Sequence, residues 1–447
     1  MSEIVTTGAN PGFLERVFKL RENKTNVRTE ILAGFTTFMT MAYIIFVNPT
    51  ILSDAGMPFG GVFIATIAGI LLGTLCMAFL TNYPFALAPG MGLNAFFAYT
   101  VVIGMGVSWQ VALGLIFAEG IIFIILSVTP VREMIVNSIP LALKTGIAAG
   151  IGLFIAFIGL TNAGIVVADP ATLVKMGDIF SGTALVAVVG LIVTGILYSL
   201  KIKGALLWGI ILATLFGWVN GVTPPLDGVV ALPTMAEWSG VLGQLDFTAV
   251  FNIGLLGVLL AFLFVDLFDT AGTLVGVSHQ AGYLDEKGKL PRANRALLAD
   301  AIGTTGGAVF GTSTVTTYVE SAAGVAEGGR TGLTGVVVSI LFLLALFFKP
   351  LVGIVPAAAT APALVIVGTM MMANITKLDW KDFTEVLPAF VAMIAMPLTY
   401  SISNGIALGF IIYPLVKLFT GQGKKVHWLV YLLGILFIAY FVWQTTG

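Results

Sequence analysis

The feature that most constrains this chain is a long run without a basic side chain. No Lys or Arg lies between Arg28 and Arg132, and most of the residues between them are apolar. Only 10% of the 447 residues are charged and 58% are hydrophobic, whereas a soluble domain has about 25% charged residues to cover its surface. A bilayer accommodates such a chain, because a spanning helix needs about 20 mostly apolar residues. The sequence therefore predicts a polytopic membrane protein.

Apolar segments recur along the chain in two series of seven, with one extra segment at the end. A polar stretch, 221–247, contains no Lys or Arg and separates the two series. The segments lie at about 31–50, 61–81, 84–101, 108–128, 140–161, 183–200, 204–220, 250–275, 295–311, 313–327, 331–348, 356–373, 383–399, 403–419 and 428–444. Only helices and closed barrels satisfy their backbone groups in lipid, and these runs lack the alternation of barrel strands. We therefore predict an all-α fold of 14 spans, with 428–444 as either a fifteenth span or an interfacial helix.

The distribution of positive charge predicts the orientation of these spans. Cytoplasmic loops carry an excess of Lys and Arg. Counted from a cytoplasmic N-terminus, the predicted inside loops hold nearly every base, and Lys175 and Lys349 are the exceptions. The inside residues are Arg16, Lys19, Arg21, Lys24, Arg28, Arg132, Lys144, Lys201, Lys203, Lys287, Lys289, Arg292, Arg295, Arg330, Lys377, Lys381, Lys417, Lys424 and Lys425. We expect a multi-pass protein of a bacterial-type inner (plasma) membrane.

Two segments are interrupted in the same way. Residues 83–94 and 311–321 are each too rich in Gly, Pro or Thr for a good continuous helix, and each is third in its series. Paired interrupted segments indicate an inverted repeat with a binding site near the bilayer midplane. At such a break, backbone N–H and C=O groups are free to bind a ligand, and the N-terminus of a half-helix favours negative charge.

Two acidic residues in the eighth segment carry the strongest chemical signal. An Asp inside a span costs about 2.5–3.5 kcal/mol on the insertion scale, so it marks function by default. Asp266 and Asp269 are three residues apart, which places them on one helix face with Cβ atoms about 5–6 Å apart. Two carboxylates that close in a low dielectric do not both stay charged, so the pair is predicted to hold a proton. The alternative is that each carboxylate bonds to Thr or backbone groups of a neighbouring helix.

One polar residue lies at each break. Glu320 lies in the tenth segment and Asn94 in the third. Asn94 offers two donors and an acceptor, which suits a flat heterocycle with mixed edges. Either residue could instead cap a half-helix.

Other polar positions carry weaker signals. We expect Glu119 to make a helix–helix or subunit contact, Asp300 to pair with nearby Arg295, and His279 to lie at the interface. The single cysteine, Cys76, excludes an intramolecular disulfide. No metal-ligand spacing or nucleophile motif is present, so the sequence predicts no cofactor and no enzyme.

Several strings resemble a known family. They are Gly92-Leu93-Asn94-Ala95-Phe96-Phe97, Val265-Asp266-Leu267-Phe268-Asp269-Thr270-Ala271-Gly272-Thr273, Tyr318-Val319-Glu320-Ser321 and Gly329-Arg330-Thr331-Gly332. Together and in this order they resemble the nucleobase cation symporter 2 family, and more narrowly its AzgA-like branch of hypoxanthine, guanine and adenine permeases. The resemblance covers Arg28 to about Lys425.

This resemblance implies a 7+7 inverted repeat with short antiparallel strands in the third and tenth segments. A core domain would move against a gate domain in an elevator-like cycle, commonly within a homodimer. The implied parts are a cytoplasmic tail 1–28, a first repeat 29–220, an extracellular loop 221–248, a second repeat 249–420 and a C-terminal hydrophobic tail 421–447. The core domain would comprise 29–129 and 249–348, and the gate domain 130–220 and 349–420.

The resemblance also implies roles for individual residues. The carboxylates of Asp266 and Glu320 would accept hydrogen bonds from purine N–H groups, and Asn94 would contact the base from the opposite break. Asp269 would support the site or couple the proton. The other residues expected at the site are Tyr318, Val319, Gly92 and Thr40 as substrate contacts, and Thr270 and Ser321 in support.

The residues and the resemblance together thus imply a proton-coupled importer of the 6-oxopurines hypoxanthine and guanine, because the Gly92-Leu93-Asn94 string resembles the hypoxanthine/guanine members more than the adenine-preferring ones. An adenine or broad-purine permease remains an alternative. An anion transporter on the same fold is disfavoured, because buried Asp266, Asp269 and Glu320 would repel an anion. An intramembrane enzyme is disfavoured by the missing motifs. The expected partners are a purine nucleobase, H⁺, the lipid bilayer and a second copy of the chain, and no nucleic acid.

Overall fold

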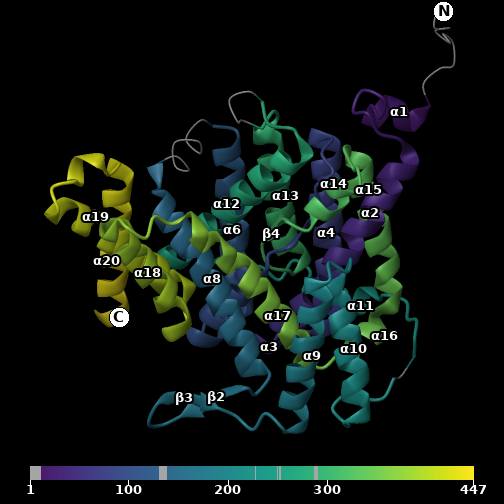
Figure 1. The fold of residues 1–447 in the computed structure, drawn as a ribbon, viewed down its shortest axis with the longest axis horizontal. Helices are drawn as coiled ribbons and strands as arrows, with labels where there is room; N and C mark the ends of the chain where they lie inside the picture. The colour runs from purple at the N-terminus through teal and green to yellow at the C-terminus, as the bar shows by residue number, and fades with distance from the viewer. Residues whose placement is uncertain are drawn as a thin grey trace, which may run out of the picture.

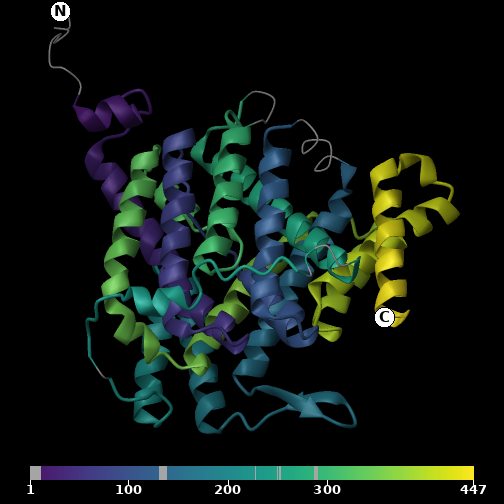
Figure 2. The same ribbon diagram turned by 180° about the vertical axis from the view of Figure 1, so that it is seen from behind.

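The computed structural model describes residues 12–129, 138–226, 228–248, 250, 253–285 and 290–446. The start of the predicted tail, 1–11, and the predicted inside bases Arg132, Lys287 and Lys289 lie outside these residues. Figures 1 and 2 show one bundle of helices, with α1 (Phe13–Phe18) at one end and the β2–β3 hairpin at the other.

The first four predicted segments are helical except at two places. Segment one is a helix pair with a short break, and segment three begins as a strand. The elements are α2 (Val27–Met41), α3 (Ile44–Asp54), α4 (Phe59–Thr81), β1 (Leu87–Pro89), α5 (Met91–Ala95), the π-helix η1 (Phe96–Gly104) and α6 (Trp109–Ser127). Asn26 starts α2, because its side chain accepts a hydrogen bond from the backbone N–H of Thr29.

The rest of the first series follows as helices α8 (Leu141–Asn162), α9 (Gly182–Ser199) and α10 (Ala205–Val219). Between α8 and α9 the chain forms an antiparallel hairpin of β2 (Val166–Asp169) and β3 (Leu173–Met176), which the sequence did not predict. On this hairpin Lys175 pairs with Asp169 at 3.0 Å. Lys175, one of the two exceptions to the cytoplasmic positive-charge pattern, therefore forms a local ion pair outside the helix bundle.

The second series repeats the pattern. Its elements are α11 (Met235–Ser239), α12 (Ile253–Ala281), α13 (Ala293–Phe310), β4 (Val315–Thr317), α14 (Ser321–Ala326), α15 (Gly332–Ala345), η2 (Leu346–Phe348), α16 (Lys349–Gly353), α17 (Ala357–Met372), η3 (Ala373–Lys377), α18 (Phe383–Leu398), α19 (Ile402–Phe419), η4 (Gly423–Lys425) and α20 (Trp428–Thr446). The other exceptional lysine, Lys349, pairs with Glu237 of α11.

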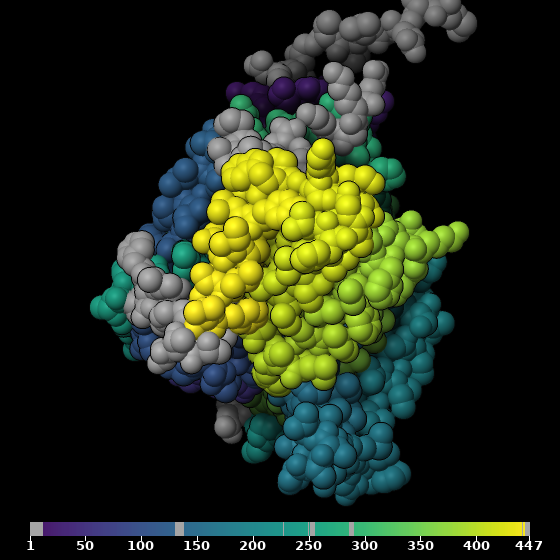
Figure 3. Space-filling view, turned by 90° about the vertical axis from the view of Figure 1, so that its left-hand side faces the viewer, coloured from purple at the N-terminus to yellow at the C-terminus, as the bar shows by residue number. Residues whose placement is uncertain are grey.

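The helical architecture confirms the predicted fold class. Among the described residues, nine helices are long and apolar enough to cross a membrane by length and composition, and four shorter apolar helices accompany them. Helix α20 packs against α19 and α12. In Figure 3 this C-terminal segment, in yellow, covers a face beside residues near 400.

The two interrupted segments meet inside the bundle. Strands β1 and β4 pair antiparallel with Leu87 opposite Thr317, Ala88 opposite Thr316 and Pro89 opposite Val315. Helix α5 starts two residues after β1, and α14 starts four residues after β4. The strand-like stretches expected in the third and tenth segments are therefore present, and they pair with each other.

Two groups of helices pack around this strand pair. In one group α4 lies against α13 and α15, and α6 lies against α13. In the other, α8 lies against α17 and α18, and α18 against α19. Each group has a glycine contact: a Cβ on Gly303 would lie 3.1 Å from Cα of Gly73, and one on Gly152 would lie 2.6 Å from the oxygen of Gly368. Small residues at such contacts let membrane helices approach closely.

Candidate functional site

Glu320 lies just after β4, where the strand pair gives way to α14. Its Oε1 accepts a hydrogen bond from the hydroxyl of Tyr43 at 2.7 Å. Thr40 Oγ1 lies 3.5 Å from the backbone oxygen of Glu320. Glu320 occupies the N-cap position of α14, but its side chain makes no capping hydrogen bond. The capping alternative for Glu320 is therefore wrong, and the residue is partly exposed.

Asp269 faces the same strand pair from α12. Its Oδ2 lies 3.4 Å from the hydroxyl of Thr316, a residue of β4. The carboxylate is close enough to Glu320 and Tyr318 for their charges to interact. Like Glu320, Asp269 is partly exposed. Two partly exposed acidic residues thus lie beside the strand pair, while the Tyr318 hydroxyl donates to the carbonyl oxygen of Pro89.

Asp266 lies elsewhere, fully buried on the side of α12 that faces α6 and α13. Its Oδ1 lies 3.3 Å from the hydroxyl of Thr270, and its Oδ2 lies 3.5 Å from that of Thr304. The Glu119 carboxyl lies close enough to Asp266 for the two groups to interact. The resemblance led us to expect Asp266 beside the substrate and Asp269 in a supporting role. In the structure Asp266 is fully buried, whereas Asp269 is partly exposed.

Asp300 is a buried acid whose importance the sequence did not reveal. Its Oδ2 accepts a hydrogen bond from Thr270 at 3.0 Å, and its Oδ1 accepts one from Thr317 of β4 at 2.9 Å. Asp300 is fully buried, whereas Arg295, its expected partner, is exposed. An acidic residue in the apolar ninth segment could have indicated a buried functional group. The nearby Arg295 instead led us to expect a simple ion pair.

Glu119 is also fully buried, between helices of this one chain. A contact to another subunit, one of the two alternatives for Glu119, is therefore wrong, and the helix–helix contact is correct. Neither carboxyl oxygen of Glu119 has a hydrogen-bond partner among the described residues.

Asn94 belongs to a buried polar network rather than to a cap. The N-cap of α5 is Gly90, so the capping alternative for Asn94 is wrong. Its side chain donates to Asn48 at 3.1 Å, and Asn48 donates to Thr66 at 2.8 Å and to Thr312 at 2.9 Å. The Asn94 side-chain oxygen has no partner among the described residues. The network fixes the start of α5 against α3 and the break before β4.

The remaining predicted site residues occupy different positions. Val319 is 48% exposed, and Ser321 Oγ accepts a hydrogen bond from the backbone N–H of Ala86 at 3.0 Å. Gly92 lies against α8, where a Cβ would come within 2.6 Å of Ile151. Val319 is thus accessible, Ser321 joins the two interrupted segments, and Gly92 lies where α5 contacts the second group of helices.

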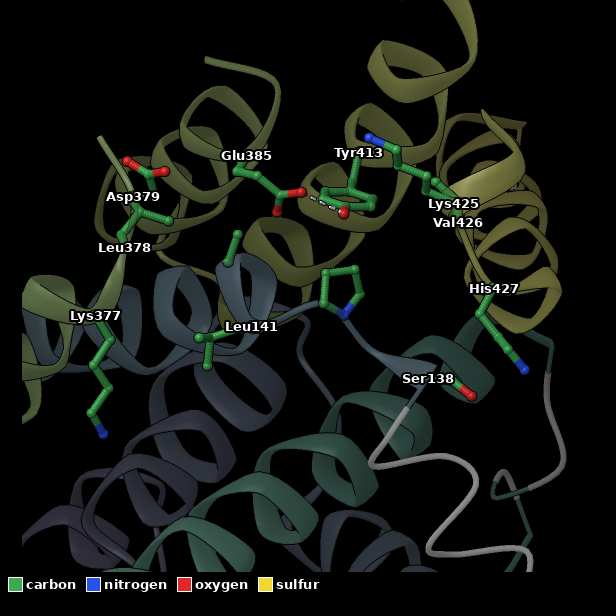
Figure 4. A pocket seen from close by; sticks show the side chains of 12 residues that line it. Ser138, Leu141, Lys377, Leu378, Asp379, Glu385, Tyr413, Lys425, Val426 and His427 are labelled. Atoms are coloured by element: carbon green, nitrogen blue, oxygen red, sulfur yellow. Dashed lines mark hydrogen bonds between the residues drawn. The ribbon is translucent and has the colours of Figure 1, made fainter. Parts of the chain in front are cut away.

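A separate cavity of about 730 Å³ lies at the end of α8, beside α18 and α19. Figure 4 shows Glu385 and Tyr413 joined by a hydrogen bond, which measures 2.9 Å, with Lys377, Lys425 and His427 around them. None of the predicted site residues lines this cavity. Among the described residues, no group of three His, Cys, Asp or Glu side chains could hold a metal ion.

Comparison with known proteins decides the family. Residues 28–408 match the model of a family described as a permease family. The chain belongs to the nucleobase cation symporter 2 family. It is therefore a multi-pass membrane transporter of a nucleobase permease family and not an enzyme.

Relatives cover nearly the whole chain. A putative permease of Methanocaldococcus jannaschii is 54% identical over 96% of this chain and 98% of its own. The adenine permease AdeP of Escherichia coli is 47% identical over 97% of both chains. The guanine/hypoxanthine permease PbuO of Bacillus subtilis is 48% identical over 94% of this chain and 98% of its own.

Solved structures share the fold at low identity. The transmembrane domain of the cyanobacterial bicarbonate transporter BicA has a TM-score of 0.64 and 15% identity, covering 86% of this chain and 97% of its own. The murine anion transporter Slc26a9 has a TM-score of 0.60 and 11% identity, covering 94% of this chain and 74% of its own. These similarities support the 7+7 inverted-repeat fold.

Proposed function

We propose that this protein imports the purine nucleobases hypoxanthine and guanine together with a proton. The observation that carries the proposal is the pair of partly exposed acids, Asp269 and Glu320, beside the β1–β4 pair. Carboxylates accept hydrogen bonds and donate none when ionised. They suit the N–H groups of a neutral purine, and their charge disfavours an anion like the one named for BicA.

The similarity to known relatives does not distinguish among the purines. Relatives named for adenine and for guanine and hypoxanthine are about equally similar to this chain, at 47% and 48% identity. The 6-oxopurine choice rests on the resemblance of the Gly92-Leu93-Asn94 string to the hypoxanthine/guanine members, because the unpartnered amide oxygen of Asn94 is an acceptor that suits an N–H of either purine class. An adenine or broad-purine permease is the alternative, and a competition experiment distinguishes the two.

We further propose an elevator-type cycle, in which core residues 29–129 and 249–348 move against gate residues 130–220 and 349–420. The two packing groups support this division. Hydrogen bonds between them include Asn162 to the Tyr99 hydroxyl at 2.8 Å and the Thr100 hydroxyl to the Tyr400 oxygen at 3.1 Å. An ion pair joins Lys203 to Glu327. Such exposed or single polar contacts can break and reform at modest cost.

The orientation and assembly also belong to this proposal. The N-terminus would be cytoplasmic in an inner (plasma) membrane, and two copies would form a homodimer. A reporter fused after Gly447 tests the tail, because a cytoplasmic reporter would exclude a fifteenth span at α20. Crosslinking in native membranes tests the dimer.

Transport is tested by uptake of radiolabelled hypoxanthine in cells that lack their own purine permeases. Unlabelled guanine, adenine, xanthine and uracil serve as competitors, and a protonophore removes the gradient. We expect saturable uptake that guanine competes and the protonophore abolishes. Competition by adenine alone would replace the 6-oxopurine assignment, and competition by no purine would remove the substrate proposal. Uptake that survives the protonophore would remove proton coupling.

A further inference from the structure

Three carboxyl groups from different helices lie near one another in the interior: the Thr270 hydroxyl contacts Asp266 at 3.3 Å and Asp300 at 3.0 Å, and Glu119 is close enough to both acids to interact with them. Glu119 comes from α6, Asp266 from α12 and Asp300 from α13, and all three are fully buried. We name them the rear acid cluster. It differs from the substrate-facing acids, Asp269 and Glu320, which are partly exposed.

Glu119 indicates what this cluster binds. Both of its carboxyl oxygens are buried without a hydrogen-bond partner among the described residues, although its neighbours are Asp266 and Asp300. An ionised carboxylate only accepts hydrogen bonds, so two ionised acids cannot satisfy each other. A buried acceptor without a donor costs about 1–3 kcal/mol, and more when it is charged. A proton between Glu119 and Asp266 would supply the missing donor and remove one of the facing negative charges.

We infer that Glu119, Asp266 and Asp300 bind the coupled proton at a site separate from the substrate-facing acids. This inference rests on the proposed proton-coupled transport, and it says where in the molecule the proton is held. The step is a simple protonation: a carboxylate takes up H⁺ from the side of higher proton concentration and releases it on the other side. No covalent bond to the substrate forms or breaks.

The contacts of the cluster connect it to the substrate strand. The hydroxyl of Thr304 lies 3.0 Å from the carbonyl oxygen of Val315 in β4 and 3.5 Å from Asp266. A hydroxyl has one hydrogen to donate. A charged Asp266 draws that hydrogen toward itself, and a protonated Asp266 leaves it to β4.

A second hydrogen bond also connects the rear acid cluster to β4. Thr317, also in β4, donates to Asp300 at 2.9 Å. The strand therefore receives one hydrogen bond from the cluster side and donates another to it. Because β4 leads directly to Glu320, a change of protonation in the cluster alters the strand that positions a substrate-facing acid. Linkage then requires that the proton and the purine change each other's affinity by the same factor.

The titratable groups around Glu119 are defined by the helices packed on α6. They are Asp266 of α12 and Asp300 of α13. The titratable side chain of η1, Tyr99, is engaged elsewhere, since its hydroxyl donates to Asp54 at 2.6 Å. A change at Glu119 therefore acts mainly through the two aspartates.

The test uses Glu119→Gln in proteoliposomes, with Asp169→Asn as a matched charge-removing control on the β2–β3 hairpin. Two assays are compared: purine counterflow, which needs binding and movement but no gradient, and accumulation driven by an imposed pH gradient. We expect Glu119→Gln to keep counterflow within about threefold and to lose accumulation. Binding of one linked proton makes wild-type purine affinity change about tenfold per pH unit in the linked range, and the variant should lose that dependence.

The outcomes separate this inference from the transport proposal. Wild-type protein that exchanges purine but ignores the pH gradient would overturn proton coupling and the cluster with it. Wild-type accumulation that Glu119→Gln retains in full would overturn the cluster alone. If Glu119→Gln does not fold, Asp300→Asn is measured in the same two assays, and retained accumulation there overturns the inference. Infrared difference spectra on purine binding give an independent readout, in which a protonated-carboxyl band should disappear in Glu119→Gln.

Discussion

The hydrogen bond between Tyr43 and Glu320 allows a quantitative test of the substrate site. Tyr43 donates to Glu320 Oε1 at 2.7 Å, which leaves the other carboxylate oxygen to accept from a purine N–H. Glu320→Gln keeps nearly the same shape but removes the charge. A hydrogen bond to a charged group contributes about 1.5–3 kcal/mol, so loss of one weakens binding by about 10- to 150-fold.

Tyr43→Phe provides the matched variant, because it leaves the carboxylate and removes only the group that orients it. Its hydrogen bond to a charged carboxylate contributes about 1.5–3 kcal/mol, and because Glu320 itself binds the purine, we expect an affinity loss no larger than that of Glu320→Gln, about 10- to 150-fold. Since Tyr43 acts through Glu320, the double variant should bind about as weakly as Glu320→Gln alone, as neighbouring sites in one network are not additive.

Equilibrium binding of radiolabelled hypoxanthine to purified protein measures all three variants. Thermal unfolding of each variant checks that the fold is kept, and Asp169→Asn again serves as the control. Glu320→Gln with affinity within about twofold of the wild type would show that this carboxylate does not bind the purine. Fully additive losses in the double variant would show that Tyr43 contacts the purine independently.

Other positions give further tests. Asp269→Asn should weaken hypoxanthine binding by about tenfold in the same assay, because it removes an acceptor charge beside the strand pair; unchanged affinity would exclude Asp269 from the site. Gly332→Ala should lower the free energy of unfolding by about 1–3 kcal/mol through overpacking, because its Cβ would lie 2.3 Å from a backbone oxygen of α4. Gly195→Ala is the control, because its Cβ would meet nothing within 4 Å. Equal unfolding temperatures for the two variants would contradict this packing argument. Lys349 lowers the pKa of Glu237 from its ordinary value of 4.5, so their stabilising contact is present above that pH and is lost as the pH falls. Glu237→Gln should then unfold with a shallower acid dependence than the wild type.

The fold followed from the sequence because lipid leaves few choices. Apolar segments at 250–275 and 403–419 correspond to helices Ile253–Ala281 and Ile402–Phe419, since a spanning chain must satisfy its backbone within each helix. The resemblance to a family supplied the short strands in the third and tenth segments, but the pairing of 87–89 with 315–317 came only from the structure. The β2–β3 hairpin was missed because its strands are only four residues long and lie in the connection between two predicted spans.

Side-chain placement was harder to predict than the helices. The spacing of Asp266 and Asp269 correctly put both on neighbouring positions of one helix, but spacing says nothing about which other helices each residue faces. That depends on α6, α13 and β4, which approach α12 from distant parts of the chain. Asp300 was missed for the same reason, since the hydroxyls of Thr270 and Thr317 reach it only in the folded bundle.

Asp266 and Asp269 lie in different surroundings. This difference explains how purine transport and proton binding can be linked although the two ligands occupy separate sites. Residues three apart on a helix are neighbours on its surface, yet here Thr316 of β4 contacts Asp269 while Thr304 of α13 contacts Asp266. A single proton shared directly by the pair would make purine and proton compete for the same oxygens. With the proton on the rear acid cluster, the substrate-facing carboxylates stay available as acceptors while the buried charge is neutralised. Helix α12 and strand β4 contact both sites, so either ligand can favour the same arrangement of these two elements, which is the physical requirement for symport.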